Sequence, residues 1–254
     1  MDRRVDIMRM KPWESLPESL QSEAVRPYYD LLKKRTASLL LKRGMDILAA
    51  FLLLVLLSPV FLVLAVAIRV DSKGPVFFRQ VRVTQFGKTF RIFKFRTMVN
   101  DAEKKGSQVT VQNDSRVTRV GAKIRRIRLD EIPQLLNVLT GDMSFVGTRP
   151  EVPKYVEKYT PEMMATLLLP AGVTSTASIA FKDEDELLQA AENVDEVYVR
   201  DVLPQKMAYN LEYLRNFSFG RDIGLLFQTV FRVFGVSGSR RTDDDTEAGG
   251  ERKS

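Results

Sequence analysis

One long apolar stretch stands out in the pattern of hydrophobic and polar residues along the chain. It runs from Ile47 to Ile68, 22 residues without a charged side chain. At about 1.5 Å per residue a helix of this length is long enough to cross the ~30 Å hydrocarbon core of a bilayer. A secretory signal peptide would begin near the N-terminus, whereas more than 40 residues precede this stretch. The pattern therefore predicts a membrane element that the protein retains.

The middle of the stretch carries a helix-breaking pair, Ser58 and Pro59. Proline lacks an N–H donor and disfavours helix at the preceding residue, so each half is about 15 Å long, half a bilayer. Lys42 and Arg43 precede the stretch and more basic residues follow it, so the positive-inside rule puts both flanks in the cytoplasm. A re-entrant hairpin satisfies this rule, with the Ser58 hydroxyl bonding a carbonyl freed at the kink. A kinked single span is the alternative.

Shorter patterns predict the surrounding elements. Residues 28–40 mix apolar and basic side chains, typical of an amphipathic helix on a membrane surface or, equally, of a helix packed on a soluble domain. Residues 76–83 and 89–96 are β-branched and aromatic runs with partial alternation, which predict a β-hairpin turning at Gly87.

Pro133 is tolerated only in the first turn of a helix, so a helix is expected to start near Asp130. Its apolar stripe would consist of Ile132, Leu135, Leu136 and Leu139. Further helical patterns cover residues 197–217 and 223–234.

Composition adds a firm exclusion. The 254 residues include no histidine and no cysteine, which rules out disulfides, Cys/His zinc sites, thiol nucleophiles and Ser-His relays. The net charge of +7 is distributed unevenly, since residues 69–128 contain 16 Lys or Arg and 4 Asp or Glu, a local net charge of +12. Such a segment fits a polyanionic partner: nucleic acid, anionic lipid or a diphosphate.

Asp130 and Glu131 follow this basic segment. They can be interpreted as a helix N-cap and a first-turn dipole partner. They can also be interpreted as catalytic residues. An aspartate with an ordinary pKa of about 3.9 is ionised at neutral pH, so it can attack phosphorus without a general base. Two unit charges ~4 Å apart repel by about 4 kcal/mol at an effective dielectric of ~20. Arginines, a helix N-terminus and a Mg²⁺ ion on Glu131 would offset that repulsion.

Three motifs in order resemble those of the bacterial sugar transferase family, the monotopic phosphoglycosyl transferases. They are Lys94-Phe-Arg-Thr-Met, Leu129-Asp-Glu-Ile-Pro-Gln-Leu-Leu-Asn-Val-Leu and Gly141-Asp-Met-Ser-Phe-Val-Gly-Thr-Arg-Pro. The similarity covers about residues 41–233. It implies an α+β, helix-dominated monotopic membrane protein: a re-entrant hairpin broken at Ser58-Pro59 and entered at Lys42-Arg43, with a cytoplasmic catalytic domain containing a small β-hairpin. The expected parts are 1–38 (polar segment and amphipathic helix), 39–70 (hairpin), 71–236 (catalytic domain) and 237–254 (disordered tail).

The resemblance implies transfer of a sugar 1-phosphate from a UDP-sugar to a polyprenol phosphate such as undecaprenyl phosphate, with release of UMP. This step would initiate exopolysaccharide, capsule, O-antigen or glycoprotein glycan assembly. Asp130 would be the nucleophile that forms a phosphosugar enzyme, and Glu131 with Asp130 would hold Mg²⁺. Arg125 and Arg149 align with phosphate-binding arginines of the family, and Asp222 aligns with a late aspartate near the site.

Lys94 and Arg96 are two residues apart on a predicted strand, so both can face one side and bind the same anion, a diphosphate or an anionic lipid. The alternative is a basic sheet face against head groups. The acidic run 183–186 is interpreted as a solvated helix start, since consecutive carboxylates on a helix point in different directions.

The chain departs from the family at two places. Gly-Pro-Arg-Pro is Gly147-Thr-Arg-Pro here, and the stretch expected near the sugar or nucleotide reads Pro170-Ala-Gly-Val-Thr-Ser-Thr-Ala-Ser. The sugar is therefore not specified.

We expect the cytoplasmic face of the bacterial inner membrane as the location, membrane lipids as partners and no nucleic-acid partner. A homo-oligomer and downstream glycosyltransferases stay open. The competing hypothesis is a membrane-tethered protein that binds anionic lipid or nucleic acid without catalysis.

Overall fold

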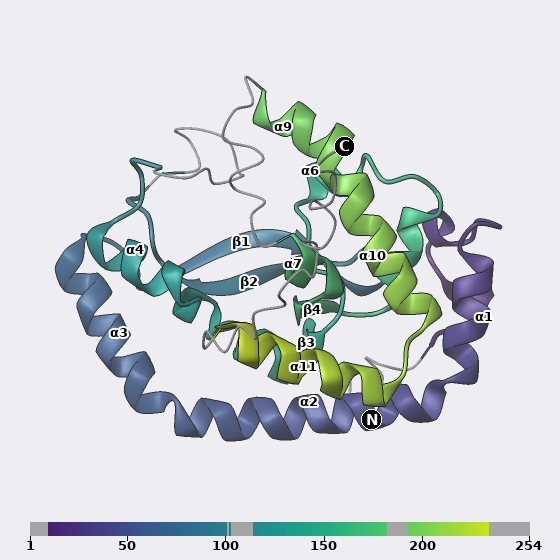
Figure 1. Ribbon diagram of the computed structural model, residues 1–254, viewed down its shortest axis with the longest axis horizontal. Helices are drawn as coiled ribbons and strands as arrows, with labels where there is room; N and C mark the ends of the chain where they lie inside the picture. The colour runs from purple at the N-terminus through teal and green to yellow at the C-terminus, as the bar shows by residue number, and fades with distance from the viewer. Residues whose placement is uncertain (1–9, 101, 103–113, 182–192, 234–254) are drawn as a thin grey trace, which may run out of the picture.

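Helices dominate the computed structural model, which describes residues 10–100, 102, 114–181 and 193–233 (Figure 1). The α-helices of the described residues are α1 (Arg26–Lys34), α2 (Thr36–Leu56), α3 (Ser58–Asp71), α4 (Arg119–Arg126), α5 (Gln134–Thr140), α6 (Pro153–Val156), α7 (Thr176–Ala180), α9 (Val194–Val197), α10 (Leu203–Arg215) and α11 (Phe219–Val233). The strands are β1 (Phe77–Val83), β2 (Thr89–Phe95), β3 (Met143–Val146) and β4 (Ala171–Thr174). The 3₁₀ segments are η2 (Trp13–Ser15), η3 (Glu18–Leu20), η4 (Gln85–Gly87), η6 (Leu129–Glu131) and η7 (Met163–Leu168), and η8 (Tyr198–Val202) is π-helical.

The predicted break in the apolar stretch is confirmed. Helices α2 and α3 meet at Leu57 and are bent by 61°. Pro59 cannot donate to the carbonyl of Val55, four residues earlier, and the hydroxyl of Ser58 donates to that carbonyl instead, at 2.8 Å. The Val55 carbonyl, which the proline leaves without its helical N–H donor, is therefore still hydrogen-bonded within the bend.

The two halves of this bent pair present apolar side chains outward. Each of the following is more than half exposed: Leu48, Phe51, Leu52, Val55 and Leu56 of α2, and Leu62, Val63 and Val66 of α3. No single helix in the described part of the chain has the length and hydropathy to span a bilayer, whereas α2 and α3 taken together do. An exposed apolar surface of this extent is unusual for a soluble monomer.

The predicted β-hairpin is confirmed. Strands β1 and β2 pair antiparallel in a register that runs from Phe77 opposite Phe95 to Val83 opposite Thr89. The turn η4 contains Gly87 at φ 71° and Phe86 at φ 58°, both left-handed. Glycine takes this conformation without steric cost, which explains its position in the turn.

A second sheet was not predicted from the pattern. Strands β3 and β4 pair in parallel, with Met143 opposite Ala171 and Val146 opposite Thr174. Just past β3, Gly147 packs directly on Gly172, so that a Cβ at Gly172 would lie 2.2 Å from the Gly147 nitrogen. This close approach joins the loop after β3 to the segment after Pro170.

The N-terminal helix packs on the domain. Tyr28, Tyr29 and Leu32 of α1 are buried in one cluster with residues of η7 and α10. This agrees with the second interpretation of residues 28–40, a helix packed on the protein. Helix α1 ends at Lys34 and α2 begins at Thr36, so the predicted single helix is in fact two.

The C-terminal part forms the other long helices. Helices α9 and α10, with η8 between them, occupy the predicted 197–217 region, and α11 packs against α2 and β3 (Figure 1). Phe227, Val230 and Phe231 of α11 are more than half exposed. The acidic run 183–186 and the 237–254 tail lie outside the described residues.

Candidate active site

Asp130 and Glu131 lie in a short 3₁₀ turn between α4 and α5. Arg128, at φ 54°, turns the chain sharply before them, a left-handed conformation that is uncommon for a residue with a side chain. The helix expected near Asp130 starts instead at Gln134, after Pro133. Neither carboxylate caps a helix, so the N-cap interpretation is wrong and the dyad is left free for another role.

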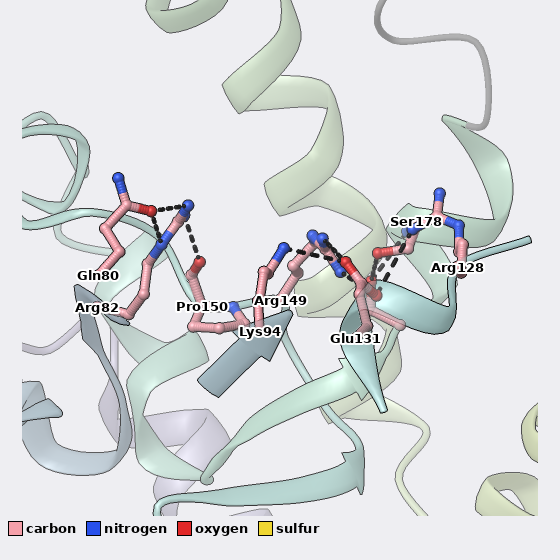
Figure 2. Close-up of polar contacts among 9 residues, drawn as sticks. Gln80, Arg82, Lys94, Arg128, Glu131, Arg149, Pro150 and Ser178 are labelled. Atoms are coloured by element: carbon pink, nitrogen blue, oxygen red, sulfur yellow. Dashed lines mark hydrogen bonds and ion pairs between the residues drawn. The ribbon is translucent and has the colours of Figure 1, made fainter. Parts of the chain in front are cut away.

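Glu131 is the centre of an ion-pair cluster (Figure 2). Arg149 Nη2 lies 2.5 Å from Glu131 Oε1, and Lys94 Nζ lies 3.1 Å from the same oxygen. Arg128 Nη1 lies 3.8 Å from Oε2. Burial alone would raise the pKa of Glu131, but Arg149 and Lys94 hold it well below its usual range. Glu131 is therefore ionised at any physiological pH.

Asp130 differs from its neighbour. Its side chain is nearly buried, with 9% exposed, and within the described residues it forms no hydrogen bond or ion pair. Burial raises the pKa of Asp130, while the charges of Lys94, Arg125 and Arg149 oppose the rise. An ionised carboxylate without a protein partner keeps its lone pairs for an incoming electrophile.

The predicted phosphate-binding residues divide into two groups. Lys94, Arg125 and Arg149 lie near the dyad: two of them bind Glu131, and Arg125, half-buried in the last turn of α4, acts on the charge of Asp130. Arg96 does not join them. The prediction that Lys94 and Arg96 face one anion is wrong, because β2 ends at Phe95 and its alternation ends there.

Arg96 is instead buried at the C-terminal end of α3. Its guanidinium donates to the carbonyls of Ser72 and Lys73, both at 2.7 Å. It therefore holds the exit of the bent helix pair to the β-hairpin.

Lys42 and Asp222 form a buried ion pair. Lys42 Nζ lies 2.5 Å from Asp222 Oδ2, with side-chain exposures of 1% and 0%, and Tyr213 donates to Asp222 Oδ1 at 2.8 Å. Both carboxylate oxygens are thus occupied, and the structure does not bring Asp222 to the dyad as expected. The pair ties the start of α2 to α11.

Arg43, the next residue, caps helix α5. Its guanidinium donates to the carbonyls of Val138 and Leu139 at 2.6 and 3.1 Å. These carbonyls lie in the last turn of α5, where a cation is stabilising. Arg43 therefore holds the start of the bent helix pair against the helix that follows the dyad.

Sequence reasoning missed two arginines of this region, Arg82 and Arg128. Arg82 shares the face of β1 that Gln80 occupies, and its guanidinium donates to the Gln80 side chain and to the Pro150 carbonyl (Figure 2). Gln80 and Arg82 are two residues apart on a strand, and side chains on a strand alternate between its faces. This alternation could have predicted that the two side chains share a face.

The divergent segment after Pro170 adjoins the Arg149 loop. Gly147 N donates to the Thr174 carbonyl at 3.0 Å and Gly172 N donates to the Thr148 carbonyl at 2.8 Å. Ser175 caps the short helix α7 by accepting from Ser178 N at 2.9 Å, and Ser178 is seen in the same close-up as Glu131.

The chain belongs to the bacterial sugar transferase family, because the family's sequence profile matches residues 37–236. The chain is 38% identical over 234 residues to the UDP-glucose:undecaprenyl-phosphate glucose-1-phosphate transferase of Escherichia coli, covering 90% of this chain and 47% of that protein. It is 37% identical over 203 residues to an Aeromonas hydrophila protein, covering 79% of this chain and 45% of the relative. That relative is a UDP-N-acetylgalactosamine-undecaprenyl-phosphate N-acetylgalactosaminephosphotransferase.

A shorter relative matches over more of its own length. The UDP-glucose:undecaprenyl-phosphate glucose-1-phosphate transferase of Caulobacter vibrioides is 37% identical over 199 residues, 77% of this chain and 70% of that protein. The chain thus spans about half the length of the first two relatives and most of the third.

Proposed function

We propose that this protein transfers a sugar 1-phosphate from a UDP-sugar to a polyprenol phosphate such as undecaprenyl phosphate, releasing UMP. The observation that carries the proposal is the division of the dyad: Glu131 binds the surrounding cations, whereas Asp130 has no partner in the described structure. The names of the relatives support the same substrates. The product would begin the assembly of a lipid-linked glycan.

The first chemical step uses Asp130 as the nucleophile. One carboxylate oxygen attacks the β-phosphorus of the UDP-sugar, and an acyl phosphate bond forms as the phosphoanhydride bond breaks. UMP leaves with the electron pair of that bond. No general base is needed, which fits a chain without histidine. Arg149, Lys94 and Arg125 offset the charge that accumulates on the phosphate oxygens.

In the second step the phosphate of the polyprenol attacks the same phosphorus. Its oxygen is already an anion, so this step also requires no proton removal. The bond to Asp130 breaks, the carboxylate returns and the lipid diphosphate sugar leaves.

A magnesium ion fits these residues only together with the substrate. Within the described residues, no group of three or more acidic side chains is suited to a metal ion. Proteins nonetheless often bind Mg²⁺ through only one or two carboxylates, and substrate phosphates then supply other ligands. Asp130 and Glu131 would hold the ion, which would neutralise phosphate charge when bound.

The bent helix pair supports a re-entrant membrane attachment at the cytoplasmic face of the inner membrane. Its outward apolar side chains suit lipid, its bend is satisfied by Ser58, and Lys42 and Arg43 hold its first helix to the catalytic part. A lipid phosphate cannot leave the head-group plane, so this attachment would bring the dyad to its second substrate.

A UMP-release assay with undecaprenyl phosphate tests the proposal. UDP-glucose, UDP-galactose and the UDP-N-acetylhexosamines should be screened separately, because the relatives are named for two different sugars. We expect release with at least one of them, dependent on Mg²⁺ and absent in Asp130→Asn. Asp30→Asn, which changes an exposed ion pair of α1, is the matched control and should keep full turnover.

The covalent intermediate is tested without the lipid. Intact-mass measurement after incubation with the UDP-sugar should show the wild type heavier by one sugar phosphate, and Asp130→Asn unchanged. A non-catalytic binder of anionic lipid or nucleic acid would instead release no UMP and would keep its salt-dependent binding in Asp130→Asn.

A further inference from the structure

Arg82 lies at one end of a row of charged groups that begins at the dyad. The row runs from Glu131 to Arg149, which is followed in the chain by Pro150, and the Pro150 carbonyl accepts from Arg82 Nη1 at 3.0 Å (Figure 2). Figure 2 shows the side chains of Arg82, Lys94 and Arg149 extending to the same side. Arg82 also acts electrostatically on Lys94, and Glu131 on Arg82, so it belongs to the same electrostatic environment.

The guanidinium of Arg82 is fixed by neutral groups. Gln80 Oε1 accepts from Nε at 2.9 Å and from Nη2 at 2.6 Å, and Pro150 accepts from Nη1. These bonds use three of the five N–H donors of an arginine and leave two. The orientation is therefore set while part of the donor capacity stays available to a ligand.

No carboxylate in the described residues forms an ion pair with Arg82. The carboxylate of Glu151 follows Pro150, whose carbonyl binds Arg82, in the chain. Its Oε1 accepts from the Tyr198 hydroxyl at 2.6 Å and lies 3.5 Å from Lys206 Nζ. Burial lowers the pKa of Arg82, since water is largely removed from its charge. The carboxylates of Glu151 and Glu131 partly oppose this lowering from beyond ion-pair distance, so an anionic ligand in direct contact would offset more of the cost of desolvation.

We propose that Arg82 binds the phosphate of the nucleotide that leaves, the α-phosphate of the UDP-sugar. The inference rests on the function proposed above. With the β-phosphorus at Asp130, the α-phosphate is one bridging oxygen further from the nucleophile, along the row toward Arg82. When the phosphoanhydride bond breaks, the bridging oxygen stays with UMP and gains negative charge, which Arg82 stabilises through its two remaining donors.

The test measures binding of UMP, which does not require turnover. Calorimetry in detergent micelles should give UMP an affinity about 10- to 100-fold weaker for Arg82→Gln than for the wild type, as expected for lost hydrogen bonds to a charged group. The matched control is Arg79→Gln on the same strand. Arg79 is exposed, stacks on Phe93 and donates to the Arg91 carbonyl, and its variant should bind UMP as the wild type does.

Steady-state kinetics give the second measurement. In Arg82→Gln the KM for the UDP-sugar and the inhibition constant of UMP should rise by similar factors, and the KM for polyprenol phosphate should not change. A rise confined to the polyprenol phosphate would overturn the assignment, since Arg82 would then bind the lipid phosphate. Unchanged UMP affinity in folded Arg82→Gln would also overturn it.

A second variant keeps the test decisive if Arg82→Gln does not fold. If Arg82→Gln loses its cooperative thermal transition, Arg82→Lys replaces it, since lysine keeps the charge and lacks the planar guanidinium donors. Arg82→Lys should bind UMP several-fold more weakly than the wild type. Wild-type affinity in this variant would refute the proposal. Failure of the proposed function is distinguishable: a wild type that releases no UMP with any UDP-sugar refutes that function, while the UMP titrations still decide the role of Arg82 as a phosphate site.

Discussion

The carboxylate of Glu131 is held by the guanidinium of Arg149, with 2.5 Å between Oε1 and Nη2. Asp130, one residue earlier, has no such contact in the described structure. The same cations therefore act differently on two adjacent acids: they hold the pKa of Glu131 well below its usual range, while burial raises that of Asp130. Opposed environments of this kind are typical of paired carboxylates with different roles.

Asp130→Asn should abolish UMP release and increase stability. A buried aspartate whose folded pKa is raised destabilises the folded state when it is ionised at pH 7, so removing the charge relieves that cost. A stabilisation on the order of 1 kcal/mol corresponds to roughly 2 to 4 °C in Tm. Thermal unfolding at pH 7 measures it, and the gain should disappear at pH 3, where Asp130 is protonated in both states. A variant less stable than the wild type at pH 7 would contradict the assignment of its environment.

Glu131→Gln should have the opposite effect on stability. Because the folded pKa of Glu131 is lowered, its contribution is present above the unfolded value of about 4.3 and is lost as the pH falls through the folded value. The wild type should therefore be the more stable protein at pH 7, and its advantage should shrink below about pH 4. Urea unfolding at several pH values tests this, with the exposed Glu157→Gln as the control that should show no such trend.

Breaking the Lys42 and Asp222 pair should destabilise the fold strongly. Lys42→Met leaves Asp222 buried without its counter-charge, which costs about 3 to 5 kcal/mol. The double variant Lys42→Met with Asp222→Leu should recover part of this loss, because no charge is then buried alone. Chemical unfolding in detergent gives the double-mutant cycle. Two additive single effects would show that the ion pair does not exist in solution.

The topology of the bent helix pair can be tested by labelling. The chain has no cysteine, so single cysteines at Lys33 and Lys88 report without background; both positions are exposed. A membrane-impermeant maleimide should label both only from the cytoplasmic side. Labelling of one of them in intact cells would mean that α2 and α3 cross the membrane as a single kinked span.

The sequence was informative wherever local chemistry decides the structure. Pro59 was enough to predict the bend, and Gly87 marked the turn of the β-hairpin. The cluster around Glu131 was predicted in part, because Lys94 and Arg149 belong to motifs shared with the family.

Errors arose where tertiary contacts decide. Arg96 was expected to share an anion with Lys94, whereas it donates to backbone carbonyls, because strand alternation was extended one residue past Phe95. The late helix start depends on the left-handed turn at Arg128, which no local pattern predicted. Asp222 was expected at the dyad, but its partner Lys42 lies 180 residues away in the chain.

The bond from Ser58 to the Val55 carbonyl joins residues three positions apart. The geometry of the bend is thus specified by a few consecutive residues, and all of them precede the dyad in the order of synthesis by more than 60 positions. A ribosome making this protein has therefore added every residue of this bond before it reaches Asp130. The local geometry of the bend can therefore form before the later segments exist, and those segments then add the contacts of Lys42 and Arg43 that hold the bent helix pair to the rest of the protein.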